Sequence, residues 1–161
     1  MDVEMKIRGL MVDPSTNAPI VILKDVAGDT VLPIWVGLYE ANAIALEVEK
    51  ASPPRPMTHD LLKNLIHGLN AEVQRVVVTE LKDDTFYAAI WMEQNGESVI
   101  IDARPSDAIA LALRADCPIY VSEEVLKVAK VIPNAADPAT SEELRRWLEN
   151  LNDEDMGRYK M

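Results

Sequence analysis

The chain has 161 residues, is 48% hydrophobic, and carries a formal net charge of −11. This length suits one domain with a short appendage, and the composition is too apolar for a disordered chain. The negative charge argues against a broad nucleic-acid-binding face, because Lys and Arg carry non-specific phosphate binding. Any contact with DNA or RNA should therefore use a local basic site.

Compartment signals are few and agree with one another. No apolar run reaches the roughly 18–20 residues that span a bilayer, and the acidic start, Met1-Asp2-Val3-Glu4, lacks the basic segment of a secretory signal. Cys117 is a single cysteine that has no partner for an internal disulfide, so we interpret it as a buried, inert thiol. The sequence predicts a cytoplasmic protein that does not span a membrane.

The first half of the chain predicts three strands followed by two helices. Apolar runs between turn signals favour strands at residues 5–12, 19–23 and 30–36. The spacing of Ala41, Ile44, Ala45 and Val48 is typical of a helix, which three prolines within 53–56 should end. Thr58 is the predicted N-cap of a second helix over 58–70. Its expected buried stripe consists of Leu62, Leu65, Ile66 and Leu69.

The second half predicts the same order of elements. Strands are expected at 73–81, 86–92 and 98–102, and Gln94-Asn95-Gly96-Glu97 indicates a hairpin between the last two. A helix over 105–115 should follow. The remaining elements are a short strand over 118–121 and a helix over 122–130.

The two halves are also related in sequence. Residues 40–46 align without a gap with residues 105–111, and both segments contain Ala-Ile-Ala-Leu. We interpret this as a duplicated strand-strand-strand-helix unit. The predicted fold class is therefore α+β, with a mostly antiparallel sheet and packed helices.

The pattern changes after residue 131. Residues 133–138 resemble a linker, and Thr140 with Glu143 forms a capping box for an amphipathic helix that carries Trp147. We divide the chain into a domain of residues 1–132 and a linker with a C-terminal amphipathic helix over 133–161. A terminal helix of this kind suggests docking, and we take a homodimer as the working expectation for a homo-oligomer.

Candidate chemistry is concentrated at the turn of residues 102–107. Asp102 and Asp107 flank Arg104 there, and they could hold a divalent cation such as Mg²⁺ or orient a water while Arg104 binds phosphate. Ser106 and Asp107 lie in the predicted first helical turn, where a carboxylate also stabilises the helix dipole. A purely structural role for Asp107 thus remains open.

A second polar segment covers residues 54–60. Arg55 lies between prolines, which stiffen its backbone, and it is either a phosphate ligand or a solvated side chain. His59 should point toward the apolar stripe as a neutral base or ligand, or as a hydrogen-bonded core histidine. Asp60 should lie on another face, either as a catalytic candidate or only as a helix-start acid. Glu40, which aligns with Pro105, could lend a third carboxylate or only match its helix dipole.

These segments resemble one known family. The strings Leu-Pro-Ile-Trp-Val-Gly, Pro-Arg-Pro-Met-Thr-His-Asp-Leu and Ile-Asp-Ala-Arg-Pro-Ser-Asp-Ala-Ile-Ala-Leu are similar to those of the bifunctional nuclease domain family, over about residues 5–130. The resemblance implies DNase and RNase activity, usually in an oligomer. It supplies no secure catalytic assignment, so residue roles are expected from their chemistry.

Two functions follow as hypotheses. In the first, the protein is a nuclease that hydrolyses phosphodiester bonds of DNA and RNA, in which carboxylates hold a cation or activate water and His59 is a general acid or base. In the second, it is a non-catalytic binding or regulatory module whose polar cluster is structural. For the nuclease, the predicted catalytic residues are His59, Asp60, Asp102 and Asp107, the substrate-binding residues Arg55, Thr58, Arg104 and Ser106, and the metal ligands Glu40, Asp102 and Asp107.

Overall fold

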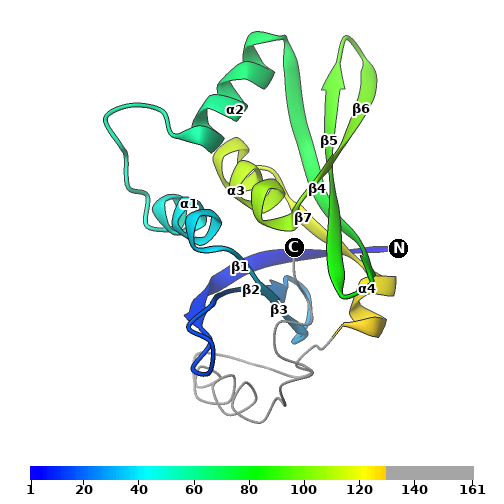
Figure 1. The fold of residues 1–161 in the computed structure, drawn as a ribbon. Coiled ribbons are helices and arrows are strands. Elements are labelled where there is room, and N and C mark those ends of the chain that lie inside the picture. Colours follow the sequence, from blue (N-terminus) through cyan, green and yellow to red (C-terminus); the bar gives the residue numbers. More distant parts are fainter. Residues whose placement is uncertain (130–161) are drawn as a thin grey trace.

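The computed structural model describes residues 1–129, in which one sheet is flanked by helices (Figure 1). The strands are β1 (Asp2–Val12), β2 (Pro19–Asp25), β3 (Val31–Trp35), β4 (Ala71–Lys82), β5 (Thr85–Gln94), β6 (Glu97–Ala103) and β7 (Ile119–Ser122). The helices are α1 (Leu38–Val48), α2 (Thr58–Gly68), α3 (Pro105–Ala115) and α4 (Glu123–Val128). Each element predicted within these residues is present, and the α+β fold class is confirmed.

The seven strands form one sheet in the order β3-β2-β1-β7-β4-β5-β6. Two antiparallel three-stranded units, β1–β3 and β4–β6, lie side by side, and β7 joins them. Among residues 1–129, the parallel pairing is that of β4 with β7. Each unit is followed by a helix, as a strand-strand-strand-helix duplication predicts. The duplication itself stays a prediction.

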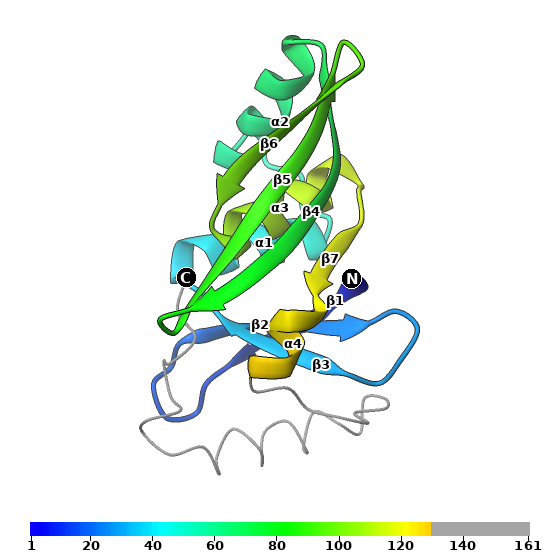
Figure 2. The ribbon, with the colours of Figure 1, turned by 90° about the vertical axis from the view of Figure 1, so that its right-hand side faces the viewer.

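The helices cover the two faces of the sheet unequally. Figures 1 and 2 show α1, α2 and α3 together on one face, while the short α4 lies on the other. Helix α3 is the centre of this arrangement, because it contacts α1, α2, β4 and β5. Its residues Ala108, Ile109 and Leu111 are fully buried. The apolar face of α3 therefore fixes the position of the helix start that carries the candidate site residues.

Local backbone chemistry explains two of the boundaries. Asn95 and Gly96 both have positive φ, 53° and 79°, between the paired residues Gln94 and Glu97. A two-residue hairpin loop requires this conformation, and Asn-Gly favours it. Pro105 is the first residue of α3, where its missing N–H costs no hydrogen bond.

Helix α2 differs from the prediction in two respects. Its N-cap is Met57 and not Thr58, and the Asp60 carboxylate accepts a hydrogen bond from the Met57 N–H. Leu65 and Leu69 are 55% and 66% exposed, so they are not part of a buried stripe. The reason is that α2 lies at the end of the helical layer and packs mainly on α3 and β4. Two side chains, Leu62 and Ile66, reach the edge of the core.

The predicted linker and amphipathic helix of residues 133–161 lie outside the described residues, and the division at residue 132 stays a prediction. Among residues 1–129, no helix is long and apolar enough to cross a membrane.

Candidate active site

A cavity of about 840 Å³ opens between α1, α2, β6 and the start of α3. Most of its wall is hydrocarbon, contributed by α1, α2 and the edge strand β6. The polar side chains Glu40, His59, Asp102, Arg104 and Asp107 also line it. A volume of this size lies within the range of small-molecule sites in proteins. This cavity therefore brings the two predicted polar segments into one site.

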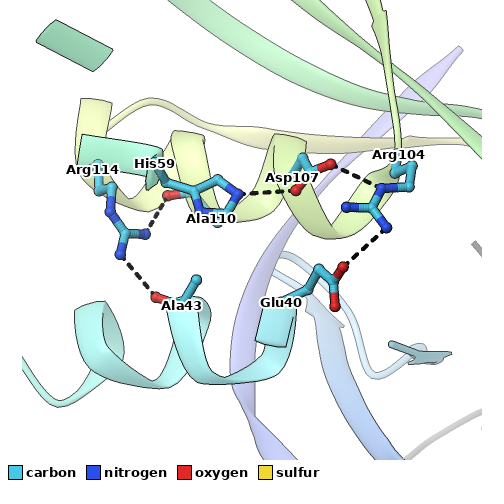
Figure 3. Close-up of polar contacts among 7 residues, drawn as sticks. All are labelled: Glu40, Ala43, His59, Arg104, Asp107, Ala110 and Arg114. Carbon is cyan, nitrogen blue, oxygen red and sulfur yellow. Dashed lines mark hydrogen bonds and ion pairs between the residues drawn. The ribbon is translucent and has the colours of Figure 1, made fainter. Parts of the chain in front are cut away.

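Four of these side chains form a continuous chain of polar contacts (Figure 3). His59 Nε2 lies 2.9 Å from Asp107 Oδ1, and the other oxygen of Asp107 accepts a hydrogen bond from Arg104 Nε at 2.9 Å. Arg104 Nη1 lies 3.0 Å from Glu40 Oε1. The side chain of His59 is 13% exposed, whereas that of Arg104 is 53% exposed. The histidine is thus shielded while the guanidinium remains open to a ligand.

The contacts are possible because three helix starts meet at this place. Glu40 lies in the first turn of α1, His59 in the first turn of α2, and Asp107 in the first turn of α3, with Arg104 as the α3 N-cap. Acidic side chains are favoured at these positions by the helix dipole and the free N–H groups. Local stabilisation of the helices and assembly of the site therefore use the same residues.

The pair of Asp107 and Arg104 stays charged at neutral pH. Burial opposes ionisation of Asp107, but the hydrogen bonds from His59 and Arg104 outweigh this effect and lower the pKa of its carboxyl. The hydrogen bond to Asp107 raises the pKa of Arg104, with a smaller contribution from Glu40. An ionised carboxylate is only an acceptor, so neutral His59 must donate its Nε2–H to Asp107. Its Nδ1 is then the basic nitrogen.

Gly37, the N-cap of α1, allows Glu40 to reach Arg104. A Cβ at residue 37 would overlap with Glu40 Oε2. The backbone of Gly37, at φ −73° and ψ 159°, is ordinary extended backbone, so the requirement for glycine is space and not conformation. The carboxylate thus folds back over its own helix start and faces the guanidinium.

The remaining predicted site residues are distributed unevenly. Asp102, on β6, and Thr58 both line the cavity. Asp102 is exposed, and it pairs with Ala89 in the β5–β6 ladder. Ser106 is buried in the first turn of α3 and, like the exposed Arg55, is not among the cavity-lining residues that the structure describes. The structure thus joins Thr58 and Asp102 to the site and leaves Ser106 and Arg55 outside the lining.

Asp60 belongs to a separate, partly buried cluster with Arg114, a residue that sequence reasoning missed. Arg114 Nε donates to Asp60 Oδ1 at 2.8 Å, and its two terminal nitrogens donate to the carbonyls of Ala110 and Ala43 at 2.9 and 3.0 Å. Its side chain is 3% exposed. The available sequence signal was a charged residue within a helix that is otherwise mostly apolar. Asp60 is not among the described residues that line the cavity.

The carboxylates do not have the arrangement of a metal site. Among residues 1–129, no group of three or more His, Cys, Asp or Glu side chains is placed to hold a metal ion. Glu40 and Asp107 both bind the guanidinium of Arg104, which supplies positive charge between them. The residues as arranged therefore do not fit a divalent cation, and the cation stays a prediction.

Comparison with known proteins assigns the family. The model of the bifunctional nuclease domain matches residues 21–134, which include every residue of the cavity, and the chain belongs to this family. It is 41% identical to the uncharacterized protein Rv1829 of Mycobacterium tuberculosis over 143 residues, which are 88% of this chain and 85% of that protein.

Plant relatives carry a more informative name. The chain is 27% identical to bifunctional nuclease 1 of Oryza sativa subsp. japonica over 130 residues, 76% of this chain and 39% of the plant protein. The match to bifunctional nuclease 1 of Arabidopsis thaliana is also 27%, over 71% of this chain and 36% of that protein. The chain thus spans less than half the length of these two relatives.

Proposed function

We propose that this protein is a nuclease that hydrolyses phosphodiester bonds of DNA and RNA at the cavity between α1, α2 and β6. The observation that carries the proposal is the contact chain from His59 through Asp107 to Arg104 at the cavity wall. The family assignment and the name of the plant relatives support the choice of substrate.

In this proposal, His59 is the general base. Asp107 holds the Nε2–H of the ring, so Nδ1 accepts a proton from a water that attacks phosphorus. The P–O ester bond to the leaving nucleotide then breaks, and the leaving oxygen takes a proton from solvent. The carboxylate also stabilises the imidazolium that forms, as a charged partner at 2.9 Å does. Asp107 is therefore proposed to orient His59 and to compensate its charge, and not to bind the substrate.

Arg104 is proposed to bind the phosphate and the charge that develops on it. Its contacts with Asp107 and Glu40 use two of the five guanidinium N–H donors within residues 1–129, and its side chain is half exposed. The remaining donors are suited to non-bridging phosphate oxygens. Asp102 and Thr58, which also line the cavity, are proposed to bind the sugar or an attacking water.

The second candidate function is a non-catalytic binding or regulatory module. It is favoured by the pairing of Arg104 with two carboxylates, which leaves the polar wall of the cavity with a net negative charge. In that case the contact chain stabilises the meeting of the helix starts, and the apolar cavity binds an uncharged ligand. A lack of cleavage by the intact site would favour this function.

The test is cleavage of radiolabelled single-stranded DNA and RNA by highly purified protein. His59→Gln and Asp107→Asn should lower kcat about 100-fold to 10,000-fold, the usual contribution of general acid–base catalysis. Arg104→Met should lower kcat/KM. The matched control is His67→Gln, which alters an exposed histidine in the last turn of the same helix and should leave the rate unchanged.

A chelator distinguishes whether Arg104 or a bound divalent cation supplies the positive charge at the site. Because Arg104 occupies the space between the carboxylates, we expect the rate to persist in EDTA. Loss of activity in EDTA that Mg²⁺ restores would instead assign Glu40, Asp102 and Asp107 as metal ligands. Equal rates in the wild type, His59→Gln and Asp107→Asn would show that cleavage does not take place at the proposed site.

We also propose a cytoplasmic homodimer. The single cysteine supports a reducing compartment. Two exposed apolar side chains outside the cavity lining, Leu69 at the C-cap of α2 and Ile100 on the edge strand β6, support a contact between copies. Light scattering after size exclusion tests the dimer, and an Ile100→Glu variant should be a monomer.

A further inference from the structure

We infer that Arg114 and Asp60 are positioning residues, which hold the first turn of α2 so that His59 meets Asp107. This inference rests on the proposed function for its effect on rate. Its structural content is that the His59–Asp107 hydrogen bond depends on the partly buried ion pair of Arg114 with Asp60, and this can be measured without an activity assay.

Arg114 joins three helices through one buried guanidinium. It lies in the last turn of α3 and donates to the Ala110 carbonyl of the same helix. It also donates to the Ala43 carbonyl of α1 and to the Asp60 carboxylate of α2 (Figure 3 shows the two carbonyl contacts). A charged group that is 97% buried is tolerated because these contacts satisfy it, and its side chain has little freedom.

Asp60 transmits this restraint to the backbone at the start of α2. One oxygen accepts from Arg114 Nε at 2.8 Å, and the other accepts from the Met57 N–H at 2.9 Å. The carboxylate therefore ties the N-cap of α2 to the body of α3. His59 lies in the chain between Met57 and Asp60. These two residues therefore fix the position of its backbone.

Apolar packing holds α2 only weakly. The helix has no fully buried residue, and Leu61, Leu65 and Leu69 are exposed. Polar contacts to α3 consequently carry more of the positioning than in a helix with a buried stripe. Two of these contacts come from adjacent residues of α2. His59 binds Asp107 and Asp60 binds Arg114, and we call this pair of contacts the clamp.

The two α3 residues of the clamp lie on one helical face. Asp107 and Arg114 are seven positions apart, which corresponds to about two turns of helix. One point of the clamp is the proposed reactive pair of His59 and Asp107, and the other is the ion pair of Asp60 and Arg114. Loss of the second point should leave the first turn of α2 free to move relative to α3, which weakens the His59–Asp107 hydrogen bond.

The measurement is the imidazole region of a long-range ¹H–¹⁵N NMR spectrum of the full chain. The protein has two histidines, so His67→Gln assigns both rings, and His67 at the other end of α2 is an internal control. The wild type should show His59 as a single tautomer with the proton on Nε2. Asp107→Asn gives the reference for a broken contact.

Arg114→Met and Asp60→Asn should each move the His59 nitrogen shifts at least halfway to the Asp107→Asn values, with the His67 shifts unchanged. Arg114→Lys keeps the positive charge but not the planar guanidinium. Its His59 nitrogen shifts should therefore lie between those of the wild type and those of Arg114→Met. Wild-type His59 shifts in a folded Arg114→Met protein would overturn the inference. If Arg114→Met does not fold, Asp60→Asn and Arg114→Lys decide it in the same way.

Kinetics provide the second readout. Arg114→Met and Asp60→Asn should lower kcat at least 10-fold and change KM less than threefold, since neither residue lines the cavity. A fall in kcat with unchanged His59 shifts would contradict positioning through His59. If the wild type has no nuclease activity, the proposed function fails, whereas the NMR comparison still confirms or overturns the clamp.

Discussion

Glu40 controls how much positive charge Arg104 offers to a ligand. Its carboxylate lies 3.0 Å from the guanidinium, at a contact where both side chains are partly exposed. Glu40→Gln should tighten the binding of a short oligonucleotide about fivefold, which corresponds to about 1 kcal/mol for a partly exposed ion pair. Fluorescence anisotropy measures the change. Weaker binding by Glu40→Gln would mean that Glu40 orients Arg104 and does not oppose its ligand.

Gly37→Ala should have the same effect on binding by a steric route. The added Cβ would displace the Glu40 carboxylate, while the extended backbone at residue 37 accepts alanine. Gly68→Ala is the matched control, because no atom lies within 4 Å of the added Cβ there. Unchanged affinity in Gly37→Ala together with tighter binding in Glu40→Gln would show that Glu40 keeps its contact by another rotamer.

Cys117 should be an unreactive thiol, although the structure shows it partly buried and not fully buried as the sequence predicted. Burial raises the pKa of its thiol to about 11. At pH 8 the thiolate fraction is then on the order of 1 in 1,000, compared with about 1 in 4 for a free cysteine. Alkylation by iodoacetamide should be at least 100-fold slower in the folded protein than in urea, as mass spectrometry can follow. Comparable rates would indicate local opening around the start of β7.

Sequence reasoning found His59, Arg104 and Asp107 because each is marked locally by a helix start or a proline. It could not assign a role to Arg114. The partners of Arg114 are Asp60 and Ala43, which lie 54 and 71 positions away, and one of them is a backbone carbonyl. Contacts of that kind depend on how α1, α2 and α3 pack together, and no spacing along the chain encodes them.

At the scale of the element, the N-terminus of α2 should make stability depend on pH. The hydrogen bond from the Met57 N–H, together with Arg114, lowers the pKa of the Asp60 carboxyl. A lowered folded pKa stabilises the protein above the unfolded value of about 4, and this stabilisation is lost as pH falls through the folded pKa. The wild type should therefore exceed Asp60→Asn by about 2 kcal/mol in unfolding free energy at pH 7.

Urea unfolding at pH 7, 5, 4 and 3 measures this difference. The gap between the wild type and Asp60→Asn should be constant from pH 7 to about pH 5 and should narrow progressively below about pH 4. A gap as large at pH 3 as at pH 7 would mean that the ionised form of Asp60 is not what stabilises α2.

Secondary structure was predictable because most elements are marked at both ends. The Asn95-Gly96 loop and Pro105 fix boundaries through backbone conformation alone. The burial of α2 was not predictable in the same way. Leu62, Leu65, Ile66 and Leu69 have helical spacing, but how many of them are covered depends on the neighbours that the fold supplies. Periodicity indicates which side of a helix is apolar, and tertiary packing determines how much of it is buried.

At the scale of the whole molecule, the negative charge should limit how nucleic acid is held. With a net charge of −11 and one half-exposed Arg at the cavity, the protein should neutralise one or two phosphates. The logarithm of the binding constant for single-stranded DNA should then fall with the logarithm of salt concentration with a slope of about −1. Titrations between 50 and 300 mM salt measure it. A slope steeper than about −4 would require a basic surface beyond this site.

The central position of β7 has a consequence during synthesis of the chain on the ribosome. β7 lies between β1 and β4, and Asp2 pairs with Ser122 across the β1–β7 ladder. At a translation rate of 5–20 residues per second, β1 is therefore synthesised on the order of 10 s before β7. During that interval one edge of each three-stranded unit is uncovered and able to pair with another nascent chain. Chains released early should depend on chaperones, and those that end before Ile119 should aggregate.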